Sequence, residues 1–176
     1  DSICVLGSTG SYMYLTRTER ARVIQLAIEH AGDVPVMAGI GALRTRDVLE
    51  LAQDAQKLGV KGVLLAPVSY QKLSADEVFD LFDAITGAIS VPLCVYDNPA
   101  TTQFNFTDAL YSRIGKLPNV ASIKIPPVPA HPNQARTRID QLRSILPDHI
   151  TIGISGDASA ADGLLAGCQA WYSVIG

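Results

Sequence analysis

Short apolar segments alternate with longer amphipathic segments along the whole chain. Seven of the short segments are rich in aliphatic and β-branched residues, and most are continuously apolar, which is typical of strands covered on both faces. These predicted strands cover residues 3–6, 35–38, 62–66, 93–96, 121–125, 151–155 and 171–175. The alternation predicts repeated βα units around a parallel sheet.

The helices between these strands have recognisable ends. Two capping boxes stand at helix starts: Thr16 with Glu19, and Ser74 with Glu77. Glycines stand where helices should stop, at positions 32, 59, 87, 115 and 167. The segment 125–133 holds four prolines and is interpreted as one long loop between a strand and a helix.

The strand count bears on the fold class. Eight parallel strands close a (β/α)₈ TIM barrel, and the pattern here supplies seven. The chain begins almost directly in a strand and stops inside one. We therefore expect an α/β fold in which residues 1–176 form a single barrel domain with seven of eight strands, the first βα unit and the C-terminal helical part being absent from this chain.

Composition limits the partners. The 176 residues are 48% hydrophobic and 18% charged, as in an ordinary globular protein, and no apolar run approaches the roughly 20 residues that span a bilayer. A net charge of -3 without a basic stripe argues against nucleic acid and membrane surfaces. We expect a cytoplasmic protein that binds small molecules. Its three cysteines, Cys4, Cys94 and Cys168, are interpreted as buried thiols.

Candidate chemistry is expected at the C-terminal ends of strands, where loops can vary while the opposite face holds the fold together. Lys124 is the strongest candidate. Its neighbours in strand 121–125 are apolar, so burial should desolvate the ammonium group and lower its pKa. A neutral lysine amine is a nucleophile towards carbonyl carbons. The alternative is a structural lysine whose stem is buried while its charge reaches solvent.

Two further strand ends could act with Lys124. Tyr96 ends the preceding strand, where its phenol could transfer protons during imine formation; packing beneath a loop is the alternative. Ser8 and Thr9 lie in the turn Gly7-Ser8-Thr9-Gly10, whose N–H groups and hydroxyls suit a carboxylate, although an ordinary turn has the same composition.

Together these motifs resemble the superfamily of dihydrodipicolinate synthase and N-acetylneuraminate lyase, the class I pyruvate-dependent aldolases. In chain order, Gly7-Ser8-Thr9-Gly10 is similar to the pyruvate-carboxylate loop, Tyr96-Asp97-Asn98-Pro99 to the catalytic tyrosine motif, and Ile123-Lys124 to the Schiff-base strand. The resemblance implies that Lys124 forms an imine with pyruvate or a related 2-oxo acid, that Tyr96 relays protons, and that no cofactor is needed.

The resemblance also implies roles for three more side chains. Ser8 would connect Tyr96 to a second tyrosine, Tyr70, which family members supply across a dimer interface, so a homo-oligomer (dimer or tetramer) is expected. Here one extra residue separates Pro67 from Tyr70. Tyr172 would face the substrate from the last strand, where the family usually has a small or aliphatic residue.

Two departures concern the second substrate. Thr101 stands where the synthase has an arginine, so a bidentate anchor for a carboxylate is lost, and Ser11 replaces a usual glutamate. The first hypothesis is a lyase or aldolase that makes or breaks a carbon–carbon bond through the Lys124 imine, with an unidentified second substrate. A dehydratase that acts on a 2-oxo sugar acid through the same imine is an alternative, and so is a barrel that binds 2-oxo acids without turnover.

Overall fold

The computed structural model describes residues 1–174, which form repeated βα units. The strands are β1 (Ile3–Val5), β2 (Val36–Gly39), β3 (Gly62–Leu65), β4 (Leu93–Tyr96), β5 (Val120–Ile125), β6 (Thr151–Ser155) and β7 (Ala170–Tyr172). The α-helices are α1 (Arg17–His30), α2 (Thr45–Leu58), α3 (Ala75–Thr86), α4 (Pro99–Thr102), α5 (Asp108–Ile114), α6 (Pro132–Ile145) and α7 (Ala160–Ala166). Three short 3₁₀ turns complete the described elements: η1 (Ser8–Gly10), η2 (Tyr12–Tyr14) and η3 (Asp157–Ser159).

The seven strands form one parallel sheet in chain order, β1 to β7. The seven predicted strands are confirmed within a residue or two at most ends. The prediction for 171–175 is too long, because β7 ends at Tyr172, and its last residue lies outside the described part of the chain. Both predicted capping boxes are present at the starts of α1 and α3.

The sheet is curled, and two contacts demonstrate it. The Tyr172 hydroxyl on β7 lies 3.1 Å from the Cys94 sulfur on β4, and Ser8, which follows β1, lies 3.2 Å from Asn98, which follows β4. Each pair is three strands apart in the sheet order. In a flat sheet, three strand spacings would separate such residues by about 14 Å.

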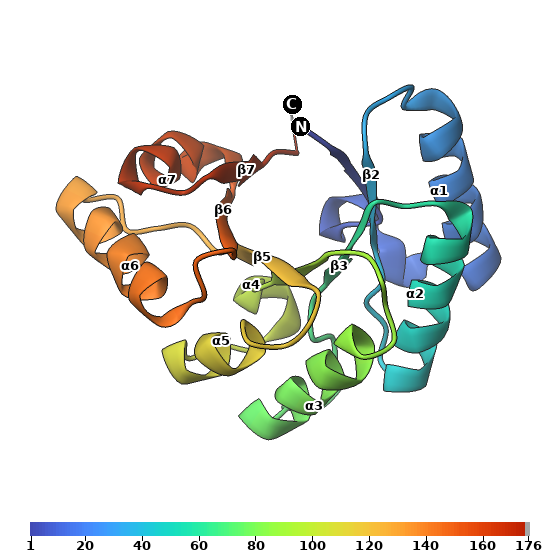
Figure 1. The fold of residues 1–176 in the computed structure, drawn as a ribbon, viewed down its shortest axis with the longest axis horizontal. Coiled ribbons are helices and arrows are strands. Elements are labelled where there is room, and N and C mark those ends of the chain that lie inside the picture. Colours follow the sequence, from blue (N-terminus) through green and yellow to red (C-terminus); the bar gives the residue numbers. More distant parts are fainter. Residues whose placement is uncertain (175–176) are drawn as a thin grey trace.

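Helices cover the outer side of this curl, as Figure 1 shows. The side chains that alternate outward from the strands pack against the helices, and those of Val63, Leu65, Ile123, Ile152 and Ile154 are fully buried there. This apolar layer fixes the strands from outside. The alternate residues of each strand point to the inner side of the curl, where polar side chains can lie.

Two close approaches are built into the sheet. At Gly39 a Cβ atom would lie 1.9 Å from the backbone oxygen of Leu6, so only glycine fits where the ends of β1 and β2 converge. At Gly153 on β6 a Cβ atom would lie 2.3 Å from the ring of Tyr172. Gly39 therefore allows β1 and β2 to converge, and Gly153 leaves room for the Tyr172 ring inside the curl.

One prediction about the cysteines is wrong. Cys94 and Cys168 are buried, but Cys4 on β1 is exposed. Apolar neighbours in the sequence do not show how far other elements cover a side chain. Among residues 1–174, no helix is both long and apolar enough to cross a bilayer.

Candidate active site inside the curled sheet

Lys124 lies on the inner side of the curl near the end of β5. Its neighbours Ile123 and Ile125 are buried on the opposite side, whereas Lys124 is half-buried. Burial lowers the pKa of the amine, and the nearby Cys4, Cys94 and Asp157 act in the opposite direction. This environment is the one in which a lysine amine becomes nucleophilic near neutral pH.

Tyr96 is the neighbour of Lys124 on the next strand. The two residues are register partners between β4 and β5, and the Lys124 Nζ atom lies 4.2 Å from the centre of the Tyr96 ring. Burial raises the pKa of the Tyr96 phenol, and hydrogen bonding with Ser8 and Asn98 counteracts this effect. The phenol is therefore protonated at neutral pH, and the amine lies over its ring.

The turn after β1 supplies the polar edge of this site. Gly7 begins it, Ser8 to Gly10 form η1, and Ser11 follows in a left-handed conformation with φ 50°. The Asn98 amide donates to the Ser8 hydroxyl at 3.2 Å and to the Thr101 hydroxyl at 3.0 Å. The structure thus brings Ser8 together with Tyr96, while Thr9 is exposed in the same turn.

Sequence reasoning gave Asn98 no role, although it lies in the tyrosine motif. Its side chain links two loops that are far apart in the chain, those after β1 and β4. An amide directly after a strand end is a signal that could have found it, because such a group reaches neighbouring loops of the same rim.

Tyr172 is a second aromatic neighbour of the amine. The Lys124 Nζ atom lies 5.2 Å from the centre of the Tyr172 ring, so two aromatic rings lie close to it. The Tyr172 hydroxyl lies 2.8 Å from the Ser122 hydroxyl and 3.1 Å from the Cys94 sulfur, both deeper inside the curl. Neither Ser122 nor Cys94 was predicted to take part in the site.

Behind Tyr96 stands a buried polar pair. Asp97 follows Tyr96 and points to the helix side, where its Oδ2 atom accepts a hydrogen bond from the hydroxyl of Tyr111 on α5. The backbone N–H of Asp97 donates to the Lys124 carbonyl at 3.0 Å. This pair therefore anchors the end of β4 to both β5 and α5.

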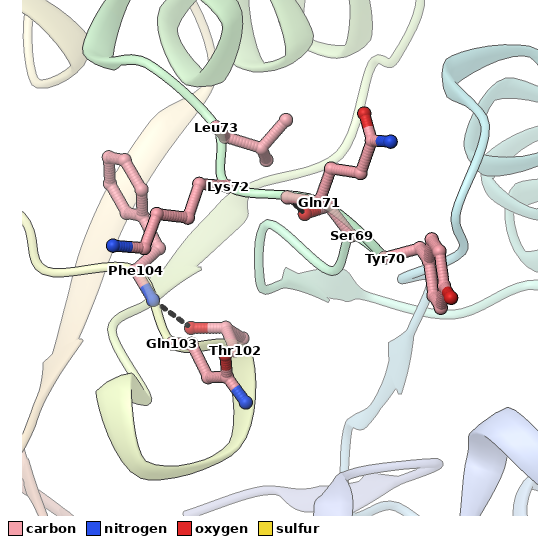
Figure 2. Close-up of a pocket in the computed structure, with 8 residues that line it drawn as sticks. All are labelled: Ser69, Tyr70, Gln71, Lys72, Leu73, Thr102, Gln103 and Phe104. Atoms are coloured by element: carbon pink, nitrogen blue, oxygen red, sulfur yellow. Dashed lines mark hydrogen bonds between the residues drawn. The ribbon is translucent and has the colours of Figure 1, made fainter.

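Tyr70 does not join this group within one chain. Its side chain is 93% exposed, and it makes none of the ring or hydrogen-bond contacts recorded for Lys124 and Tyr96 in residues 1–174. Figure 2 shows it among the residues that line a small pocket of about 130 Å³ between the loops after β3 and α4. The residues lining that pocket are Ser69 to Leu73 and Thr102 to Phe104, so it is separate from the Lys124 interior.

Comparison with known proteins identifies the family. The model of the dihydrodipicolinate synthetase family matches residues 1–175. The chain belongs to the dihydrodipicolinate synthetase family. The 4-hydroxy-tetrahydrodipicolinate synthase of Desulforudis audaxviator is 32% identical over 170 residues, which cover 94% of this chain and 54% of that protein. The resemblance inferred from the motifs is thereby confirmed.

Solved structures of dihydrodipicolinate synthases have the same fold. The enzyme from Agrobacterium tumefaciens matches with a TM-score of 0.94 and 46% identity, over 99% of this chain and 59% of that chain. The enzyme from Acinetobacter baumannii, solved in complex with pyruvate, matches with a TM-score of 0.86 and 28% identity, over 99% of this chain and 58% of that chain. This member of the dihydrodipicolinate synthetase family thus spans little more than half the length of these relatives.

Proposed function

We propose that this protein is a Schiff-base lyase or aldolase that acts on pyruvate or a related 2-oxo acid, with Lys124 as the nucleophile. The observation that carries the proposal is the desolvated Lys124 amine, 4.2 Å from the Tyr96 ring on the adjacent strand. Membership of the dihydrodipicolinate synthetase family and the pyruvate complex of a relative support the choice of substrate. No cofactor is required by this chemistry.

The proposed reaction begins with the neutral amine. Lys124 Nζ attacks the ketone carbon of the 2-oxo acid, and the carbonyl oxygen takes a proton that Tyr96 delivers to give a carbinolamine. The nitrogen passes a proton to the Tyr96 phenolate, and Tyr96 returns it to the hydroxyl, which leaves as water and gives the protonated imine. Loss of a proton from the adjacent carbon gives a neutral enamine. That carbon attacks the aldehyde carbon, the aldehyde oxygen takes up a proton, and water hydrolyses the new imine to release the product and free Lys124.

The turn after β1 is proposed to hold the substrate carboxylate. The hydroxyls of Ser8 and Thr9 and the first N–H groups of a 3₁₀ turn are donors of the right type for an anion. Ser8 also contacts Asn98 and Tyr96, so a carboxylate bound here would place the ketone carbon near the Lys124 amine.

We infer that the second substrate is neutral and hydroxylated rather than a carboxylate. Position 101 is a threonine whose hydroxyl accepts from Asn98, and Asn98 also donates to Ser8, so amide and hydroxyl groups face the mouth. Groups of this type match the hydroxyls of a hydroxyaldehyde. They also suit a dehydratase that uses the same imine. Product analysis distinguishes the two reactions, because a dehydratase releases water whereas an aldolase consumes or releases an aldehyde.

The whole protein is proposed to be a cytoplasmic homo-oligomer, at least a dimer. The exposed Tyr70 supports this proposal, because its phenol does not join the site of its own chain and can therefore contribute to the site of a second subunit. The curled sheet and its outer helices are proposed to be the larger part of a single (β/α)₈ barrel domain, which the structural match to barrel enzymes of the family supports.

Reductive trapping tests the proposed nucleophile. Incubation with pyruvate and borohydride near pH 7.5, followed by peptide mass mapping, should place a stable adduct on Lys124, because its lowered pKa leaves more neutral amine than an ordinary lysine with a pKa near 10.4. The Lys124→Arg variant should give no adduct, and the matched control Lys61→Arg, at the exposed start of β3, should label like the parent.

The outcome that would overturn the proposal is a parent protein in which Lys124 remains unmodified, or in which exposed lysines are modified to the same extent. An adduct without turnover of any aldehyde or 2-oxo sugar acid would instead indicate a binding protein that has kept the lysine. A panel of hydroxyaldehydes and carboxylated aldehydes should show turnover only with the former.

A further inference from the structure

The rings of Tyr96 and Tyr172 both lie near the Lys124 amine, and the two phenols have different surroundings. The Tyr96 hydroxyl is associated with Ser8 and Asn98 at the mouth of the curl. The Tyr172 hydroxyl points inward to Ser122 and Cys94. The two tyrosines therefore cannot serve the amine in the same way.

The proton of the Tyr172 hydroxyl is committed to Ser122. The Ser122 hydroxyl donates its single proton to the Thr151 carbonyl at 3.1 Å, so at its 2.8 Å contact with Tyr172 it accepts. The Cys94 thiol has one proton for two acceptors, the Tyr172 oxygen at 3.1 Å and the Val95 carbonyl at 3.7 Å. This chain of hydrogen bonds ends on a backbone carbonyl, which neither takes up nor releases a proton at neutral pH, so it is a tether and not a relay.

The space around the ring is shaped for it. Gly153 on β6 is the register partner of Lys124, and a Cβ atom there would lie 2.3 Å from the Tyr172 ring. The Tyr172 hydroxyl contacts Cys94 on β4 and Ser122 on β5, and Gly153 on β6 leaves room for the ring. These contacts restrict the orientation of the ring. Its face is then held 5.2 Å from the Lys124 Nζ atom.

We propose, resting on the function proposed above, that Tyr172 is a positioning residue, whose tethered ring holds the Lys124 amine beside Tyr96 and takes no part in proton transfer. A lysine side chain has four rotatable bonds, and contact with both rings restricts the positions of the amine to those from which attack and proton transfer can occur together. The ring face also stabilises the ammonium form, which offsets part of the cost of burying it.

The test compares substitutions of the two tyrosines by the rate and pH profile of Lys124 adduct formation with pyruvate under borohydride trapping. Tyr172→Leu removes the ring and should slow adduct formation at least about tenfold. Its pH midpoint should fall by roughly half a unit, because the contact that stabilised the ammonium form is lost. Tyr172→Phe keeps the ring but removes both contacts of its hydroxyl, so it should slow adduct formation roughly three- to tenfold, less than Tyr172→Leu.

Tyr96→Phe is the matched comparison, because it also keeps a ring and removes only a hydroxyl. It should lose about a hundredfold or more in rate, since it removes the proton donor. Thermal unfolding of each variant controls for stability. A purely structural Tyr172 would alter the melting temperature and leave the pH midpoint where it is.

Two results would overturn the inference: a Tyr172→Leu protein with the parent's rate and pH midpoint, or a Tyr172→Phe protein as impaired as Tyr96→Phe. If Tyr172→Leu does not fold, Ser122→Ala removes the acceptor of the tether without touching the ring, and should slow adduct formation roughly three- to tenfold; an unchanged rate there would overturn the tether. Failure of the parent itself to form an adduct at Lys124 would instead refute the proposed function.

Discussion

Replacing Tyr111 by phenylalanine should destabilise the protein, and the loss should grow as the pH rises. Tyr111 is 1% exposed, and its hydroxyl donates to the Oδ2 atom of Asp97, which is 5% exposed. The Oδ1 atom of Asp97 is buried without a hydrogen-bond partner among residues 1–174. Burial raises the pKa of this carboxyl, while Tyr111 and Arg138 act to lower it. The substitution removes the one side-chain donor that the carboxylate has in the described structure.

The expected magnitude follows from the loss of a hydrogen bond to a buried charged group, which costs about 1.5–3 kcal/mol. We expect the free energy of unfolding to fall by about 2–3 kcal/mol at pH 8, or by roughly 4–10 °C in melting temperature for a chain of this length. The folded-state pKa of Asp97 is raised, so the protonated carboxyl contributes to the free energy of unfolding. This contribution is complete below the unfolded-state pKa near 4 and is lost as the pH rises through the folded-state pKa. The variant raises that pKa further, so its penalty should be smaller at pH 5 than at pH 8.

Urea unfolding followed by circular dichroism at pH 5 and pH 8 measures this difference. Tyr14→Phe is the matched control, because Tyr14 is 89% exposed and should tolerate the change. In an Asp97→Asn background, Tyr111→Phe should cost less than about 1 kcal/mol at either pH, since no charge remains to be stranded. The reasoning fails if the penalty of Tyr111→Phe is the same at both pH values, or if it persists in the Asp97→Asn background.

Two more substitutions test the sheet and the subunit arrangement. Gly39→Ala should abolish stable folding or lower the free energy of unfolding by more than about 4 kcal/mol, since its Cβ would lie 1.9 Å from the Leu6 oxygen. In the control Gly7→Ala a Cβ atom meets nothing within 4 Å, so thermal unfolding should show a change within about 0.5 kcal/mol. Equal stabilities of the two variants would contradict the close approach. Tyr70→Phe and Lys124→Ala proteins, each inactive alone, should recover part of the activity when mixed under conditions of subunit exchange; exchange confirmed by mass spectrometry without recovery would argue against a shared site.

The sequence contains enough local information to predict the elements and the principal candidate residues. Strands 93–96 and 151–155 have the predicted bounds because continuous apolar segments between turn residues admit few other structures. The capping boxes are equally local. Lys124 could be singled out because a cation flanked by buried aliphatic residues has an unusual environment wherever the strand lies.

The partners of these residues could not be predicted, because they depend on the curl of the sheet. Cys94 and Ser122 meet the hydroxyl of Tyr172 from strands three and two positions away, and no local pattern encodes that meeting. Gly153 has no signal that separates room for a ring from ordinary flexibility. The wrong prediction for Cys4 has the same origin, since its exposure depends on the surrounding elements and not on its apolar neighbours in the sequence.

The position of Lys124 is set mainly from the side of the strand that it does not face. Ile123 and Ile125 are 0% and 3% exposed and pack toward the helices, so β5 cannot shift or rotate without exposing apolar surface at both positions. Movement of the amine is therefore limited to its own side chain, and that is the freedom which the rings of Tyr96 and Tyr172 restrict. The outer core fixes the position of the strand, so only the rotamer of the Lys124 side chain remains to be set. A tyrosine whose hydroxyl is held by two contacts is sufficient to select that rotamer.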